Sequence, residues 1–283
     1  MAEALFEEGL FESGLFEGDA NRHATYNAIP GPFRLIWSNL VDESATLLTP
    51  SSAAINIENI RTLHRKRVWR TNARINETLT LDLQSTTKNI RCCALTGYNL
   101  TSTATVQLAY SDNGSTWTQL VQSTVGNYTT LFFFFSLLNN RYWRLTFNDA
   151  ANANPYIEVG RIFLGDYWEP AATVLRGWSI KVIDRSEVQR SVGQQKWTNQ
   201  KEAITQIAFQ LPPLNETDAI KNFLNIVRRI GLSQDIFLSL MPDASATYRE
   251  VTGLYGRFVT IAGVGSVSSF VYDAGTVVFE ESF

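Results

Sequence analysis

Apolar and polar residues alternate along several segments in the middle of the chain, and these segments are rich in β-branched and aromatic side chains. They are residues 54–60, 79–83, 90–95, 104–110, 141–147 and 156–165. Neighbouring side chains of a strand point to opposite faces of a sheet, so this period of two predicts strands with one face in a core. Polar residues at 148–155 predict a turn between the last two strands. We therefore expect a β-sandwich that opens with the strand at 54–60.

A turn and two strands in this region resemble those of a known fold. Residues 110–117, YSDNGSTW, predict a turn with Asn-Gly at its tip. This turn, the strand RYWRL at 141–145 and the strand IEVGRIFLG at 157–165 are similar to the corresponding parts of galactose-binding-like, or discoidin-like, jelly rolls. The resemblance covers residues 50–168 and implies a galactose-binding-like β-sandwich there.

The run LFFFFS at 131–136 has phenylalanines at consecutive positions. In a strand, consecutive phenylalanines emerge on both faces of the sheet. One pair can fill the sandwich core, and the other pair needs cover from a neighbouring domain or subunit. The run therefore predicts a contact between parts of the assembly.

The second half of the chain contains one segment with the period of a helix. Asn215 is placed to cap it, Gly231 is placed to end it, and the apolar residues between them share one stripe. That stripe is Ile220, Phe223, Leu224, Val227 and Ile230. Strands are expected around it, at 178–183, 203–211 and 235–240 and in three glycine-separated stretches beyond. The chain is thus predicted to be mainly β, with a smaller α+β domain at 172–283.

This second half resembles tail components of long-tailed bacteriophages. The similarity lies in the order of short patterns: RS…RSVG at 185–193, NFLNIVRRIG at 222–231, IFLSL at 236–240 and LYGRF at 254–258. In distal-tail and minor-tail proteins a comparable segment forms a β-sandwich with one helix and assembles into rings. The resemblance implies a homo-oligomer, in a ring, hexamer or trimer, that contacts other tail and baseplate proteins.

The N-terminal residues 1–21 contain a five-residue repeat with acidic charges only. Its apolar pairs are Leu5, Phe6, Leu10, Phe11, Leu15 and Phe16. A tail without stable structure is one interpretation. We favour a docking arm that orders on a basic groove of a neighbouring subunit, because three Leu-Phe pairs are costly to leave in water. Residues 22–49 are predicted to be a linker or docking segment, with a short strand at 33–37.

Charge and cysteine content exclude some function classes. Charged residues make up 18% of the chain and the net charge is −3, so no nucleic-acid partner is expected. The longest apolar run, 131–135, is too short to span a bilayer, so we expect no membrane insertion. Cys92 and Cys93 are adjacent, which disfavours a disulfide between them. Free thiols fit synthesis in a reducing bacterial cytoplasm, with the virion tail tip as the final location.

Catalytic chemistry has little support in the sequence. There are two histidines and no recognisable nucleophile, metal-ligand or phosphate-binding motif, so we expect no enzyme activity, no cofactor and no metal site. One alternative stays open. Carboxylates such as Asp82, Glu158, Asp166 and Glu169 could be paired in space for glycoside hydrolysis, which depends on a separation that sequence does not give.

Carbohydrate binding is the chemistry that the jelly-roll resemblance implies. Such modules hold sugars in loops at one end of the sandwich, with an aromatic side chain against the sugar and polar groups on its hydroxyls. Trp69 and Arg70, in the only basic cluster of the chain, match such loop positions, and Asp112 and Asn113 are a second choice that also fits a purely structural turn. Trp117, Tyr142 and Trp143 are expected in the core.

The sequence therefore predicts a structural component of a phage tail tip or baseplate that assembles with itself and contacts cell-surface glycans in a secondary role. The alternative is a free-standing carbohydrate-binding protein without a place in a virion. That alternative predicts a monomer with measurable sugar affinity.

Overall fold

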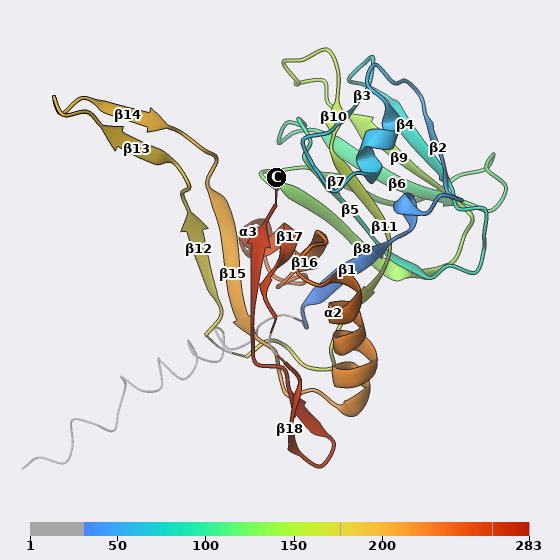
Figure 1. Cartoon of the computed structure of the whole chain (residues 1–283). Coiled ribbons are helices and arrows are strands. Elements are labelled where there is room, and N and C mark those ends of the chain that lie inside the picture. The colour runs from blue at the N-terminus through green and yellow to red at the C-terminus, as the bar shows by residue number, and fades with distance from the viewer. Residues whose placement is uncertain (1–30, 176, 262, 283) are drawn as a thin grey trace, which may run out of the picture.

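The computed structural model describes residues 31–175, 177–261 and 263–282. Figure 1 shows a sandwich of strands from the first half of the chain, with further strands and helices from the second half beside it. The Leu-Phe repeat lies outside the described residues, so its role as a docking arm stays a prediction. The domain boundaries at 50–168 and 172–283 also remain predictions.

The smaller of the two main sheets has five antiparallel strands and forms one layer of the sandwich. In spatial order they are β2 (Leu47–Pro50), β4 (Glu77–Asp82), β9 (Tyr142–Asn148), β6 (Thr105–Ser111) and β7 (Thr118–Thr124). Every second residue of β4 and β9 is buried, which is the alternation that the sequence shows.

The larger sheet has nine strands and runs through both halves of the chain. In spatial order they are β12 (Ser179–Ile183), β15 (Ile204–Gln210), β20 (Thr276–Glu281), β17 (Gly253–Thr260), β16 (Ile236–Ser239), β1 (Arg34–Asn39), β11 (Arg161–Trp168), β5 (Ile90–Thr96) and β8 (Thr130–Leu138). The pairs along this order are antiparallel.

The sandwich core lies between the five-stranded sheet and the strands β11, β5 and β8. Its fully buried side chains include Leu79, Trp143, Leu145, Leu95 and Leu164. A second core, with Phe223 and Phe279 among its members, lies under the helix of the second half. The predicted fold class is confirmed: the protein is mainly β, with a β-sandwich followed by a smaller α+β part.

Strand β1 joins the two halves, although residues 22–49 look like a linker in the sequence. Leu35 of β1 pairs with Trp168 of β11 on one side and with Leu238 of β16 on the other. Phe33, Leu35 and Ile36 are fully buried. The short strand expected at 33–37 is therefore the central link of the larger sheet.

The prediction of a strand at 54–60 is wrong. A 3₁₀ helix, η2 (Ile57–Arg61), stands there, and β2 opens the sandwich instead. Asn56 caps η2 because its side-chain oxygen accepts from the backbone N–H of Glu58 at 3.0 Å. Ile57 and Ile60 are three residues apart, so they share one face of such a helix.

The phenylalanine run has two faces, as its sequence predicts. Phe133 and Phe135 belong to the sandwich core. Phe132 and Phe134 lie on the other face, where Phe132 meets Phe237 of β16 edge-on at 6.0 Å between ring centroids. The second half of the same chain thus covers Phe132, whereas Phe134 meets Tyr167 of β11 edge-on at 5.5 Å.

The predicted helix exists, but its first part is a π-helix, which has more residues per turn than an α-helix. A π-helix (Thr217–Phe223) precedes α2 (Leu224–Ile230), and Gly231 follows at φ +55°. Asn215 caps it by accepting from the N–H of Asp218 at 2.8 Å. The winding places Ala219 and Ile226 in the core and leaves Ile220 exposed, so the predicted stripe is only partly right.

Several short elements complete the fold. They are η1 (Leu40–Asp42), β3 (Trp69–Arg70), β10 (Glu158–Val159), the hairpin of β13 (Glu187–Arg190) and β14 (Lys196–Asn199), α3 (Ala246–Thr252), and the hairpin of β18 (Gly265–Ser268) and β19 (Val271–Asp273). Helix α3 has no counterpart among the sequence predictions. Within the described ranges, each helix is too short or too polar to cross a lipid bilayer.

Candidate functional site

Trp69, the first residue predicted to bind a sugar, is part of the core. It is fully buried, its indole Nε1 donates to the carbonyl of Ser52 at 3.0 Å, and its ring meets that of Phe147 at 6.0 Å. A sugar needs an exposed ring face for stacking. Trp69 offers none in this structure, because strand β3 is covered by its neighbours.

Arg70 is half-buried at the loop end of the sandwich where β4 begins. Its Nε donates to Glu158 Oε1 at 2.8 Å, and its guanidinium lies 4.1 Å from the centre of the Tyr156 ring. The hydrogen bond with Glu158 raises the pKa of Arg70 above its ordinary value. Both contacts hold the side chain in place, so its predicted role in sugar binding stays a prediction.

Asp112 and Asn113 lie at the opposite end of the sandwich, after β6. Asn113 Oδ1 accepts from the backbone N–H groups of Ser115 and Thr116, each at 2.9 Å. Asp112 accepts from Asn140 at 2.5 Å. These bonds build the turn, which matches the structural interpretation that the sequence left open. The structure does not bring the four predicted binding residues together, because β3 and the turn after β6 lie at opposite ends of the sandwich.

The aromatic residues expected in the core differ in their surroundings. Trp143 is fully buried, as expected. Tyr142 is half-buried, with the Arg141 guanidinium 4.8 Å from its ring centre. Trp117 is also half-buried, and the Arg144 guanidinium lies 3.9 Å from its ring centre. The assignment to the core is therefore right for one of the three.

Each of the four carboxylates considered for hydrolysis is paired with an arginine rather than with a second carboxylate. The pairs are Asp82–Arg141, Glu158–Arg70, Asp166–Arg91 and Glu169–Arg34, with closest distances of 2.7, 2.5, 2.5 and 2.6 Å. Hydrogen bonding to Arg141 lowers the pKa of Asp82 below its ordinary value. A carboxyl group held in its charged form is a poor general acid.

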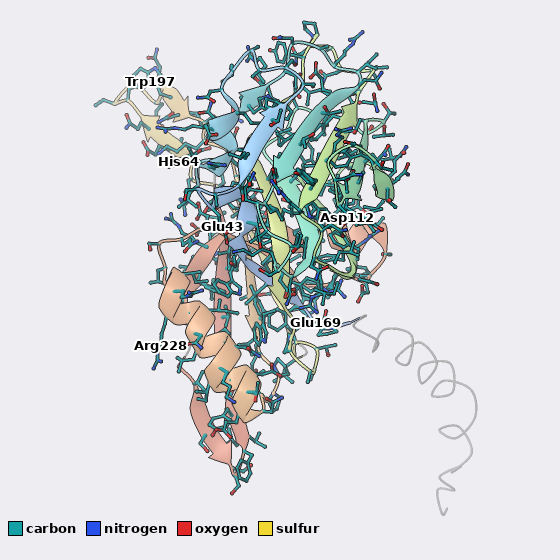
Figure 2. The ribbon with its side chains drawn as sticks, turned by 90° about the vertical axis from the view of Figure 1, so that its right-hand side faces the viewer. Glu43, His64, Asp112, Glu169, Trp197 and Arg228 are labelled. Atoms are coloured by element: carbon teal, nitrogen blue, oxygen red, sulfur yellow. The ribbon has the colours of Figure 1, made fainter. Side chains whose placement is uncertain are left out.

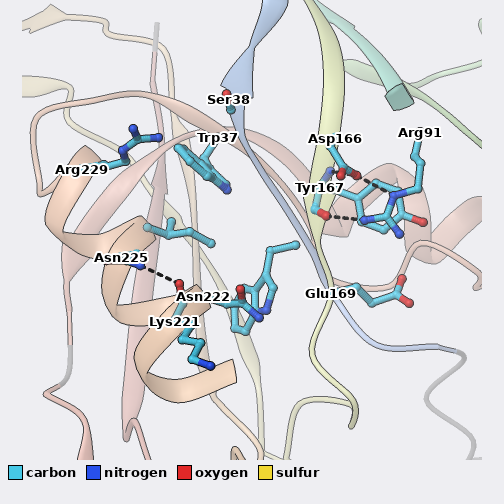
Figure 3. Close-up of a pocket in the computed structure, with 12 residues that line it drawn as sticks. Trp37, Ser38, Arg91, Asp166, Tyr167, Glu169, Lys221, Asn222, Asn225 and Arg229 are labelled. Atoms are coloured by element: carbon cyan, nitrogen blue, oxygen red, sulfur yellow. Dashed lines mark hydrogen bonds and ion pairs between the residues drawn. The ribbon is translucent and has the colours of Figure 1, made fainter. Parts of the chain in front are cut away.

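A hollow between the helix and the larger sheet gathers polar side chains, most of which the sequence analysis did not single out. We call it the crevice, and it has a volume of about 750 Å³. Strand β1 contributes Trp37 and Ser38, and β11 and β5 contribute an ion pair. The opposite wall is helical and contributes Lys221, Asn222, Asn225 and Arg229 (Figure 3).

Helix contacts fix the orientation of two amides in the crevice. Asn222 Nδ2 donates to Asp218 Oδ1 at 3.0 Å, and Asn225 Nδ2 donates to the carbonyl of Lys221 at 2.8 Å. Trp168, whose Nε1 donates to the same Asp218 oxygen at 3.2 Å, lies beneath them. Among the described residues, no donor bonds to the side-chain oxygen of either asparagine, so both oxygens can accept from a ligand.

The second feature with functional potential is the hairpin β13–β14, which stands away from the rest of the molecule (Figure 1). All eight residues of its two strands are exposed. Val188 is 53% exposed and Trp197 is 58% exposed. Exposed apolar side chains on both faces of a projecting hairpin are suited to contact with another protein.

Comparison with known proteins gives no assignment of function. No family model and no curated sequence matches the chain. Solved structures with a similar part include the Clostridium perfringens modules CpGH89CBM32-6 (19% identity, 47% of this chain and 99% of the module, TM-score 0.38) and CpGH89CBM32-5 in complex with GalNAc-β-1,3-galactose (12%, 46% and 100%, TM-score 0.39). Another is chitosan-binding module 1 of a chitosanase/glucanase from Paenibacillus sp. IK-5 (15%, 46% and 99%, TM-score 0.38). With identities below 20% and TM-scores below 0.5, these likenesses assign no ligand to this chain.

Proposed function

We propose that this protein is a structural component of a bacteriophage tail tip or baseplate. In this role it assembles with copies of itself into a closed ring, hexamer or trimer and binds other tail proteins. Its jelly roll faces outward and contacts glycans of the host surface. The proposal gives the protein no catalytic reaction.

The observation that carries the proposal is the exposed hairpin β13–β14. Together with the neighbouring strand β12 and the hairpin turn, it leaves four large apolar side chains in contact with solvent. These are Val182 (68% exposed), Val188 (53%), Val192 (105%) and Trp197 (58%). Val188 and Trp197 lie on opposite faces of the hairpin, because their paired residues are Thr198 and Gln189. Exposed large apolar side chains on one projecting element are typical of interaction surfaces. A neighbouring subunit would remove these side chains from water.

The position of β12 supports the same proposal. It is the last strand of the larger sheet, so one of its edges has no partner strand among the described residues. An open strand edge can pair with a strand of another chain. In a homo-oligomer the same contact repeats around a symmetry axis and closes the assembly. The order of sequence patterns at 185–258, which resembles phage tail proteins, favours a tail as the place of assembly.

The role of the hairpin can be tested by replacing Val188 and Trp197 with serine in the full chain. Light scattering should give an oligomer for the unmodified protein and a smaller species for V188S/W197S, because the variant loses apolar contact area. The matched control is L47S/L137S, which changes two side chains that are each 54% exposed elsewhere. An unmodified protein that is monomeric, or a hairpin variant that assembles normally, would contradict the proposal.

A free-standing carbohydrate-binding protein is the second candidate, and the crevice favours it. Its polar lining and its volume lie within the range of small-molecule sites. This candidate predicts a monomer at all concentrations that still binds a sugar. The same light-scattering measurement therefore separates the two candidates.

A further inference from the structure

The crevice lies apart from both the predicted sugar-binding residues and the hairpin. Its floor is formed by β1 and β11 and its wall by the helix, so the two halves of the chain build it together. Ligand sites commonly lie where two parts of a protein meet, with volumes of about 300–1,000 Å³. The volume of about 750 Å³ is in that range.

Several hydrogen-bonding groups of the crevice have no partner within the described part of the chain. Trp37 has a free indole N–H, Ser38 has a free hydroxyl, and Asn222 and Asn225 have free carbonyl oxygens. Ser38 and Asn225 are exposed, and Trp37 and Asn222 are half-buried. Donors and acceptors thus stand close together, which suits ligands whose hydroxyl groups both donate and accept.

The charge of the crevice is positive. Among the described residues, Lys221 and Arg229 have no carboxylate within ion-pair distance. Of the other lining charges, Arg91 pairs with Asp166 at 2.5 Å, and Glu169 pairs at 2.6 Å with Arg34, which lies outside the lining and also meets Asp243. The lining residues therefore carry three cations and two carboxylates, with the carboxylate of Asp218 beneath them, bonded to Asn222 and Trp168. Two uncompensated cations in a partly enclosed hollow attract anions. A neutral sugar would leave both of them without a partner.

An aromatic ring lies next to one of these cations. The Arg229 guanidinium is 5.2 Å from the centre of the Trp37 ring, and Trp37 is half-buried on the crevice floor. A ligand whose ring has an apolar face and an anionic substituent would contact both side chains, with the ring face on Trp37 and the anionic group on Arg229. Figure 3 shows Trp37 and Arg229 on the same side of the crevice, with Asn225 nearby on the helix.

We propose that the crevice binds a saccharide or polyol that carries a carboxylate or phosphate group. Arg229, beside Trp37, binds the anionic group, Lys221 adds positive charge from the other end of the helical wall, and Ser38, Asn222 and Asn225 bind hydroxyls. This inference rests on the glycan contact in the proposed function. It places that contact at the junction of the two halves of the chain instead of at the loop ends of the sandwich.

The test is isothermal titration calorimetry on the full chain with three probes: a galacturonic acid trisaccharide, a neutral galactose trisaccharide and a short glycerol phosphate oligomer. At least one charged probe should bind about tenfold or more tightly than the neutral one, and added salt should weaken that binding. The charged probe that binds identifies the anionic group as carboxylate or phosphate. No binding of either charged probe would overturn the inference.

Variants on the helix provide the matched control. K221Q/R229Q should lose about tenfold or more of the affinity for the charged probe, because both cations are removed. R228Q removes the neighbouring cation, which does not line the crevice, and should bind as the unmodified protein does (Figure 2). Equal affinity of K221Q/R229Q and the unmodified protein would contradict the assignment.

The same samples separate this inference from the proposed function. Their mass is measured by light scattering before each titration. An oligomer without affinity for charged probes would refute only the crevice assignment. A monomer with such affinity would refute the assembly role and support the crevice assignment.

Discussion

At the scale of single residues, one two-point charged contact of the sandwich is the pair of Asp82 and Arg141. Arg141 Nε donates to Asp82 Oδ1 at 2.7 Å, and Nη2 donates to Oδ2 at 2.8 Å. This two-point geometry joins the end of β4 to the start of β9 and is stronger than a single contact. The hydrogen bond with Arg141 lowers the pKa of Asp82, so the folded state favours the charged carboxylate.

The pair makes stability depend on pH in the acid range. Because the folded-state pKa of Asp82 is lowered, its contribution is complete above the ordinary value of 3.8 and is lost as the pH falls through the lowered pKa. D82N removes this contribution. We expect D82N to be less stable by about 1 kcal/mol at neutral pH and to lose less stability on acidification than the unmodified protein.

Urea unfolding at neutral and acid pH measures this difference. The expected result is that the difference in free energy of unfolding between D82N and the unmodified protein becomes smaller as the pH is lowered. A difference that stays constant, or that becomes larger in acid, would show that Asp82 does not contribute to stability through its charge.

Residue roles were predictable where they depend on neighbours in the sequence. Asn113 forms the expected turn and Asn215 the expected cap, because both side chains bind backbone N–H groups two or three residues away. The burial of Trp69 was not predictable, since it depends on Ser52 and Phe147, which are brought there by the fold.

At the scale of elements, the continuous larger sheet decides how the two halves of the chain are joined. Strand β1 pairs on both sides, and Phe132 on the outer face of β8 meets Phe237 of β16. Phe237 also lies 4.7 Å from the Tyr255 ring and is 1% exposed. This aromatic cluster stabilises the seam between the sandwich and the α+β part.

Loss of Phe237 should therefore weaken the whole molecule. F237A is expected to lower the free energy of unfolding by about 3–5 kcal/mol, because it opens a cavity among packed rings. The control F270A removes the same side chain where it is 76% exposed and should cost about 0.5 kcal/mol or less. Urea unfolding followed by circular dichroism compares the two. Similar losses in both variants would contradict the role of the seam.

Helices and strands were predictable from hydrophobic periodicity only where no local capping or long-range pairing overrode the pattern. Strands β4 and β9 alternate and were found, and Gly231 ends the helix as expected. Residues 54–60 alternate too, yet the cap by Asn56 favours a 3₁₀ helix. The bridging role of β1 was hidden, because its two partners lie more than a hundred residues away in the sequence.

At the scale of the whole molecule, the structure offers two separate surfaces. The hairpin β13–β14 projects with Val188 and Trp197 exposed, and the crevice lies at the junction of the two halves. The hairpin is local in sequence, but its exposure depends on the fold. The crevice combines Trp37 with Arg229 across almost two hundred residues, so no local motif could have indicated it.

Self-assembly is the central claim, and the mass of the full chain in solution tests it most directly. Light scattering should give a species several times heavier than the 31.8 kDa of one chain. Removal of residues 1–21 should reduce that mass or make it depend on concentration, because the predicted docking arm is then missing. A mass of one chain for both proteins, at every concentration measured, would contradict the account.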